Sequence, residues 1–139
     1  RTDKSGNYNI LNSVINNSII GSYCSIGQNV KVGLSRNHIR YCSTSPFLFK
    51  LVDPYFDEEP RKTVRVNIVW IGNDTIIICG IKIGDGALIG ADSMVLWDVE
   101  PYSIVAGVAS VIKKHRYSQS IIDELFKVDW HDKNPLELH

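Results

Sequence analysis

The chain has 139 residues, 15 basic and 15 acidic, a formal net charge of zero and a hydrophobic fraction of 44%. These values are typical of one globular domain and exclude a disordered chain. They also lack the basic excess of a nucleic-acid or membrane-surface binder, and no apolar run reaches the roughly 18 residues of a membrane span.

The number and spacing of the cysteines indicate the cellular compartment of the protein. Cys24, Cys42 and Cys79 are an odd number and form no Cys-x-x-Cys pair. We interpret them as reduced structural thiols, and no secretory signal peptide is visible. The expected location is therefore the cytoplasm, with no nucleic-acid and no membrane partner.

The first predicted element is a repeat with a period of six residues. Steps of six from Tyr8 reach only aliphatic residues, which are Val14, Ile20, Ile26 and Val32. Such a period fits neither a 3.6-residue helix nor an alternating strand, but it fits a chain that runs straight, turns and runs straight again. Three such sides make a triangular rung, and successive rungs stack their aliphatic side chains into a buried column. Glycine follows many of these positions, as expected at corners where φ is positive or two backbones lie close.

The period is lost after Val32, and the sequence predicts a long inserted loop over 38–66. Long loops within compact domains tend to be functional. This loop carries "SPFLFKLVDPYF", which has too much apolar surface to remain in water and should pack on a neighbouring surface. His38 lies at its root. From the residues alone, a structural histidine remains the commoner interpretation of this position, and a functional one stays open.

The six-residue period then resumes, in a register that is not continuous with the first repeat. Its members are Ile71, Ile77, Ile83, Ile89 and Val95. Together the two repeats predict an all-β chain folded as a parallel β-helix. The alternative is a β-sandwich with short strands, but sandwich turns recur about every 8–12 residues with loops of variable length.

A helical period replaces the repeat near the C-terminus. The apolar residues of "SIIDELFKV" lie on one helical face, and Ser120 with Asp123 resembles a capping box. We expect this helix to cover an open end of the β-helix or to pack on a neighbour, with Trp130 anchoring the tail. The predicted organisation is a β-helix domain over 1–112, interrupted by the loop 38–66, and a C-terminal helix and tail over 113–139 packed on the same domain.

Three stretches resemble the hexapeptide-repeat acyltransferases, and most closely their xenobiotic and streptogramin acetyltransferase branch. They are "IGSYCSIGQNVKVG", "NHIRYCSTSPF" and "VWIGNDTIIICGIKIGDGALIGADSMVLWDVEPYSIVAGV". The resemblance implies a left-handed parallel β-helix and a homotrimer. It also implies acetyl-CoA as co-substrate, bound in a groove between adjacent subunits, and a small-molecule acceptor.

The same resemblance implies that His38 is the general base of an O-acetyltransferase. The acceptor would be a hydroxyl of a sugar, a polysaccharide precursor or an antibiotic. Imidazole suits the role, because its ordinary pKa of about 6.5 lets it accept a proton near neutrality. The oxyanion-stabilising group is not identified by the sequence, and Ser43 and Thr44 are weak candidates.

The family's coenzyme contacts match five positions, which are Asn73, Ala91, Leu96, Trp97 and Lys113. The sequence differs from the family pattern in two places at or near these positions. The usual Thr-Lys pair is Leu96-Trp97, which removes a cation but supplies an indole that can lie against pantetheine or adenine. The usual Val-Pro-Ala-Lys-Val-Ile is "VASVI", which leaves Lys113, Lys114 and Arg116 as candidates for the coenzyme phosphates.

Two other functions are considered. A metal hydratase of the γ carbonic anhydrase type shares the fold but needs three histidines on zinc, and only His38 lies near the predicted coils. We therefore expect no metal requirement. A non-catalytic β-helix scaffold is the second alternative, and the altered lysine positions keep it open.

Overall fold

The structure is a computed structural model that describes residues 12–34, 45, 47–48, 51, 63–128 and 130. His38 and most of the predicted loop 38–66 lie outside these residues, as does most of the tail after 128.

Short strands dominate the described chain. The strands are β1 (Val14–Ile15), β2 (Ser18–Ile20), β3 (Ser25–Ile26), β4 (Lys31–Leu34), β5 (Val64–Val66), β6 (Trp70–Ile71), β7 (Ile76–Ile78), β8 (Leu88–Ile89), β9 (Met94–Val95), β10 (Ser103–Ala106) and β11 (Val111–His115), and they are followed by the helix α2 (Gln119–Val128). The expectation of an all-β core with one C-terminal helix is confirmed.

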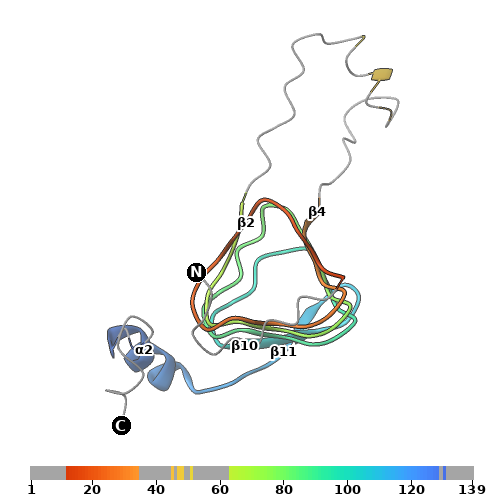
Figure 1. Ribbon diagram of the computed structural model, residues 1–139. Helices are drawn as coiled ribbons and strands as arrows, with labels where there is room; N and C mark the ends of the chain where they lie inside the picture. Colours follow the sequence, from red (N-terminus) through yellow and green to blue (C-terminus); the bar gives the residue numbers. More distant parts are fainter. Residues whose placement is uncertain are drawn as a thin grey trace.

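The strands form three sheets, which are the three sides of a coil with a triangular outline (Figure 1). Sheet A has the order β1-β4-β7-β9, and sheet B pairs β2 with β5. Sheet C has the order β3-β6-β8-β10-β11. All pairs are parallel except β10 with β11, so the chain passes from A to B to C and then begins the next turn one layer further on.

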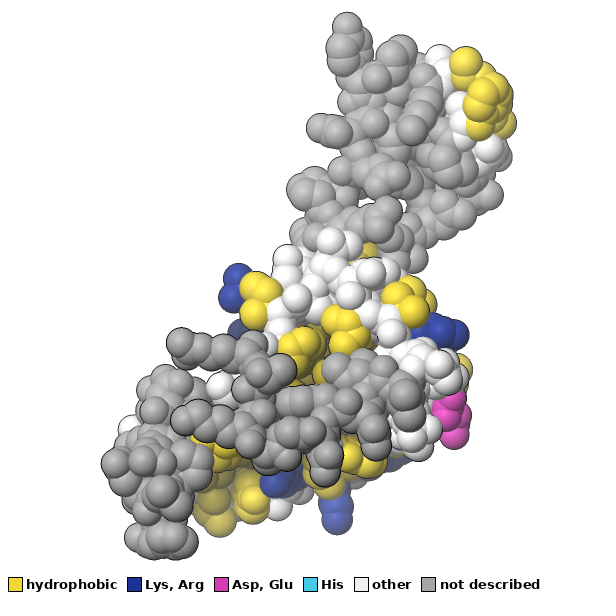
Figure 2. Space-filling view, viewed as in Figure 1, with side chains coloured by type: hydrophobic (Ala, Val, Ile, Leu, Met, Phe, Trp, Pro, Cys, Tyr) yellow, Lys and Arg dark blue, Asp and Glu magenta, His cyan; other side chains and the backbone are white. Residues whose placement is uncertain are grey.

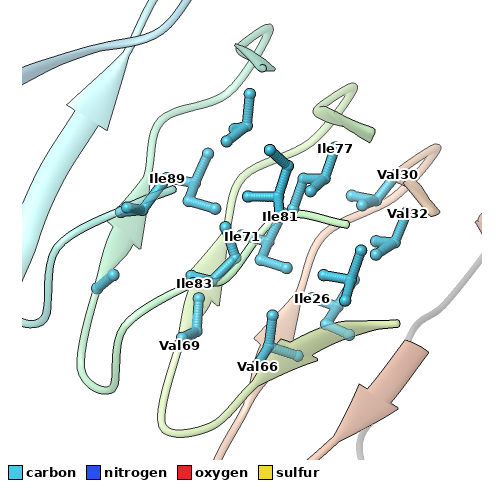
Figure 3. Close-up of a cluster of buried hydrophobic side chains, with 14 of the residues drawn as sticks. Ile26, Val30, Val32, Val66, Val69, Ile71, Ile77, Ile81, Ile83 and Ile89 are labelled. Atoms are coloured by element: carbon cyan, nitrogen blue, oxygen red, sulfur yellow. The ribbon is translucent and has the colours of Figure 1, made fainter. Parts of the chain in front are cut away.

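Each side contributes one inward-facing aliphatic column (Figure 3). The strand registers align Ile15, Val32, Ile77 and Val95 in sheet A, Ile20 and Val66 in sheet B, and Ile26, Ile71, Ile89 and Val105 in sheet C. An isolated bridge continues sheet B from Ile83 to Val99. Most of these side chains belong to the hydrophobic core, with Ile15 and Ile20 only partly buried against it. The core also contains a second set of buried residues, which are Cys24, Val30, Val64, Val69, Ile81 and Ala87.

The predicted column is correct for every member from Ile26 onward but wrong for Val14. Val14 is 44% exposed and pairs with Lys31, whereas its neighbour Ile15 pairs with Val32 and faces inward. The corner between Ile15 and Ile20 is thus one residue shorter than the period assumes.

The coil resumes after the long insertion earlier than predicted. Val64–Val66 form β5, although they fall inside the range expected to be a loop. Val66 takes the inward position of sheet B and lies five residues before Ile71. This departure from the six-residue step hid β5 in the sequence. The strand β11 likewise crosses the predicted boundary at 112/113.

Two structural features recur at the corners of the coil. Residues with positive φ recur every six positions within each repeat, and most of them are not glycine: Asn17, Tyr23, Asn29, Ile68, Asp74, Gly80, Gly86 and Asp92. The glycine that follows an inward aliphatic residue has another role. At Gly72, an added Cβ would lie 2.5 Å from the backbone nitrogen of Ala91 on the next turn. Close approach of two turns therefore requires glycine there.

We expect Gly72→Ala to lower the free energy of unfolding by about 1–3 kcal/mol, because the methyl group would force apart two packed backbones. Chemical denaturation of the variant and the wild type measures the difference. Equal unfolding midpoints would show that the two turns can separate without cost.

The C-terminal segment closes the last turn and then leaves the coil. The strand β11 is exposed along its length and pairs antiparallel with β10. By this pairing β11 covers the edge of sheet C that β10 would otherwise leave open. The helix α2 lies beyond the corner between sheets B and C, and it buries Ile122 (Figure 1). Its first turn begins at Gln119, where the N–H of Ile122 donates to the carbonyl of Ser118. The predicted capping box at Ser120 is therefore wrong, because Ser120 already lies within the helix.

Arg116 connects this segment to the coil. Its Nη1 donates to the carbonyl of Gly86 at 2.7 Å, and its guanidinium group lies 5.1 Å from the ring centre of Tyr117 and 5.9 Å from that of Tyr102. Phe126 of α2 meets Tyr102 edge-on. The Nε1 of Trp130 donates to the Tyr102 hydroxyl at 3.4 Å, as expected of a residue that anchors the tail.

Candidate functional site

Two predicted coenzyme contacts are stacked at the corner between sheets C and A. Asn73 follows β6 and Ala91 follows β8, and both are exposed. The N–H of Asp92 donates to the Asn73 carbonyl at 2.9 Å, so the two corners lie on neighbouring turns. The Asn73 side chain accepts from the N–H of Gln28 at 3.0 Å. The side-chain amide of Asn73 thus stabilises the corner on the preceding turn.

Leu96 and Trp97 lie at the corner between sheets A and B, after β9. The Trp97 side chain is 56% exposed, while its Nε1 donates to the carbonyl of Ser110 at 3.1 Å. Ser110 is held in turn, because its N–H donates to the carbonyl of Met94 at 2.8 Å. The indole is therefore fixed at one edge and open to solvent over much of its surface. Leu96 is partly buried.

Lys113 is separated from the other four. It lies on β11, where Ile112 pairs with Val105 and Lys114 pairs with Ile104, so Lys113 occupies a β-bulge. It is exposed and forms no ion pair with any residue that the structure describes. His115, two residues further, places Nε2 2.9 Å from Oε2 of Glu100. The structure thus gathers four of the five predicted contacts around sheet A and leaves Lys113 on the edge of sheet C.

His38 lies outside the residues that the structure describes. The described chain stops at Leu34, the last residue of β4, and resumes for the coil at Thr63, just before β5. Leu34 and Thr63 border the corner between sheets A and B, and His38 falls between them in the sequence. Trp97 lies at this same corner two turns further along. The position and role of His38 itself remain a prediction.

Other reactive groups in the described residues do not form a second centre. Burial raises the pKa of the Cys24 thiol above its ordinary value, which keeps it protonated and unreactive. No group of three or more His, Cys, Asp or Glu side chains within the described ranges could hold a metal ion. The same residues contain no helix that is long and apolar enough to span a bilayer.

A groove on the outer face of sheet B contains none of the predicted site residues. Its lining includes Ile19, Gly21, Arg65, Asn67, Lys82 and Asp85. The groove could not be predicted from the repeat, because Arg65 falls inside the range predicted to be a loop. The alternation of Val64, Arg65 and Val66 was the available signal, since it is typical of a strand with one polar face.

Comparison with curated proteins finds acetyltransferases. A chloramphenicol acetyltransferase of Klebsiella aerogenes is 37% identical over 121 residues, which are 81% of this chain and 58% of that protein. A probable macrolide acetyltransferase of Lysinibacillus sphaericus is 37% identical over 121 residues, which are 81% of this chain and 67% of that protein. The chain spans less than two thirds of the length of the chloramphenicol acetyltransferases that it matches. No protein-family model matches the chain.

Comparison with solved structures finds an acyltransferase that shares the fold of this chain. A mutant N-acyltransferase of Bacillus cereus, in complex with dTDP and coenzyme A, aligns with a TM-score of 0.61 at 20% identity. The alignment covers 86% of this chain and 65% of that one.

Proposed function

This chain belongs to the hexapeptide-repeat acetyltransferases, among which its relatives are named as chloramphenicol and macrolide acetyltransferases, and on this premise we propose that it is an acetyl-CoA-dependent O-acetyltransferase. The acceptor is a hydroxyl of a small molecule, such as an antibiotic, a sugar or a polysaccharide precursor. The observation that carries the proposal is the 37% identity to these relatives over 81% of the chain. The fold within the proposal is a left-handed parallel β-helix over 1–112, interrupted by the loop, with the segment 113–139 packed on it.

The reaction needs one base and one binding surface for the donor. The acceptor oxygen attacks the thioester carbonyl carbon while the imidazole of His38 takes its proton. The C–S bond then breaks, and the proton passes to the sulfur of the leaving coenzyme A. A positioned general base contributes about 10²–10⁴-fold, and holding the two substrates together adds to this. No covalent enzyme intermediate and no metal ion is required, because the thioester is already activated.

The donor lies along the outer face of sheet A. The corners at either side of this face carry Asn73 with Ala91 and Leu96 with Trp97. The outward side chains between them include Ile76 and Met94, which suit a pantetheine chain. Lys113 supplies a cation at the end of the coil for a coenzyme phosphate.

Trp97 offers a direct test of this placement. We expect Trp97→Ala to raise KM for acetyl-CoA by about tenfold, since stacking of a base on an aromatic side chain is worth about 1–3 kcal/mol. Trp97→Phe should recover most of the loss. Trp70→Ala is the matched control, because Trp70 is 44% exposed on sheet C, away from the proposed donor face. An unchanged KM in Trp97→Ala, or an equal change in Trp70→Ala, would contradict the assignment.

The proposed assembly is a cytoplasmic homotrimer in which the inserted loop reaches an adjacent subunit. Identical heterologous contacts can close a ring of three. The apolar side chains of the loop sequence support a buried interface, because they need a surface to cover them. Light scattering should give a mass near three chains, and a monomer at micromolar concentration would exclude the trimer.

A non-catalytic β-helix scaffold remains the alternative, and the loss of the usual lysine at Trp97 favours it. A thiol-release assay separates the two functions. Acetyl-CoA is incubated with chloramphenicol, a macrolide, glucose or glucosamine, and the acetylated product is identified by mass spectrometry. Release that depends on a hydroxyl acceptor supports the O-acetyltransferase. Product formed only on an amine would reassign the chain to N-acetylation, and no release with any acceptor would favour the scaffold.

A further inference from the structure

The groove on the outer face of sheet B has the features of a binding site for an anionic group. It lies between the strands β2 and β5 and the segment around Lys82, and its volume is about 260 Å³. Most of its lining is apolar, with Ile19 exposed at one end. Figure 2 shows Lys and Arg side chains next to hydrophobic ones on the side of the coil where β2 lies in Figure 1. The volume is below the ~300–1,000 Å³ of sites for drug-sized ligands, so the groove suits a small ligand or one end of a larger one.

Two cations lie side by side on this face. Arg65 of β5 is bridged in register to Lys82 on the next turn, and both are exposed and face outward. Neither head group forms an ion pair or a hydrogen bond with any residue that the structure describes. Like charges at directly opposed positions of a sheet destabilise it. A bound anion would offset the repulsion between these two cations.

Two carboxylates lie near these cations, and neither forms an ion pair with them within the part of the chain that the structure describes. Asp98, in the next position of the same row, accepts the backbone N–H of Lys82 at 2.9 Å. Asp85 lines the groove, and its Oδ2 accepts from Nδ2 of Asn67 at 3.4 Å. Each carboxylate is thus bound by a neutral N–H donor. No described residue accepts a hydrogen bond from the head group of Arg65 or of Lys82, and a guanidinium group beside an ammonium group suits a phosphate or carboxylate.

The groove also has a distinct place relative to the proposed donor site. Four of the five proposed donor contacts border sheet A, whereas the groove lies on sheet B. The two faces share one corner, at which the described chain stops at Leu34 and resumes at Thr63. Arg65 lies on β5, the first strand after Thr63. A ligand in the groove would therefore lie across this corner from acetyl-CoA in the proposed donor site.

We propose that the sheet B groove binds an oxyanion, a phosphate or a carboxylate, carried by the acceptor substrate, with Arg65 and Lys82 as its charged contacts. The assignment to the acceptor rests on the proposed function, but the oxyanion site itself does not. The substrates accepted would then include anionic small molecules such as sugar phosphates, and not only neutral antibiotics. A coenzyme A phosphate carries the same chemistry and is the other source that the experiment must distinguish.

The experiment is a titration of the isotope-labelled full chain with glucose 1-phosphate, glucose or acetyl-CoA, monitored by NMR. We expect glucose 1-phosphate to shift the backbone amide signals of Arg65 and Asn67, and glucose to bind at least tenfold more weakly. Arg65→Gln and Lys82→Gln should each weaken glucose 1-phosphate binding by about tenfold or more, because each removes a charge-assisted contact. Lys127→Gln, which removes an exposed cation from α2, is the matched control and should bind as the wild type does.

Each outcome decides one point. A loss of glucose 1-phosphate affinity with acetyl-CoA affinity unchanged supports the acceptor assignment. A loss confined to acetyl-CoA keeps the oxyanion site but assigns it to the coenzyme. Equal affinities in wild type and both variants, or equal binding of glucose and glucose 1-phosphate, would overturn the proposal.

Thermal melting of the variants should give a Tm equal to or above that of the wild type. If a variant does not fold, the salt dependence of wild-type binding decides, since an oxyanion on two cations must dissociate as NaCl rises. Binding is measured without turnover, so a catalytically inactive chain would leave the result interpretable.

Discussion

Replacing His38 by alanine is expected to lower the rate of acetyl transfer by about 10²–10⁴-fold, the usual contribution of a positioned general base. The acceptor hydroxyl would then have to lose its proton to water while it attacks the thioester. Acetyl-CoA affinity should change little, because the proposed donor contacts lie on the coil and not on the inserted segment. Steady-state kinetics with an acceptor that the wild type uses, together with acetyl-CoA titration, measure both quantities.

The control for this variant is His115→Ala. His115 is paired with Glu100 at 2.9 Å, on the strand β11 at the end of the coil. Its loss should leave the turnover number within a few-fold of wild type, with at most a weaker KM for acetyl-CoA. If His38→Ala turned over as fast as the wild type, His38 would be a structural residue and the base would have to be sought elsewhere.

Replacing Ile83 by aspartate is expected to abolish soluble expression. Ile83 is 3% exposed and belongs to the buried apolar cluster, in the aliphatic column of sheet B. Burying an unpaired charge, or the protonated acid in its place, costs several kcal/mol. A domain is stable by only about 5–15 kcal/mol in total. Expression trials followed by gel filtration and circular dichroism report the loss directly.

Two further variants separate this effect from a general intolerance of change. Val14→Asp places the same charge at a position that is 44% exposed, so the protein should remain soluble. Ile83→Val removes one methylene group and should cost about 0.5–1.5 kcal/mol. A soluble, folded Ile83→Asp protein, or an insoluble Val14→Asp protein, would refute the inward and outward assignment.

The amino-acid sequence by itself determined the repeating unit and most of the inward aliphatic column. The six-residue spacing from Ile71 to Val95 predicted which side chains are buried, because each side of the coil must turn one aliphatic residue inward. It also identified the C-terminal helix and the family, since the stretch around "IGDGALIGADS" is specific. The five donor contacts and His38 came from the resemblance to that family, and their roles are still predictions.

Only the tertiary structure decided the details that depend on corner length. Ile15 instead of Val14 faces inward, and β5 begins at Val64, because corners here absorb a missing residue without disturbing the stacked turns. The pairing of Arg65 with Lys82 was equally hidden. Seventeen positions separate the two residues in the sequence, and a parallel register brings them side by side only after a complete turn of the coil. A periodic sequence specifies what each side repeats, but contacts between successive turns depend on how many residues each corner takes, and that number is set by packing.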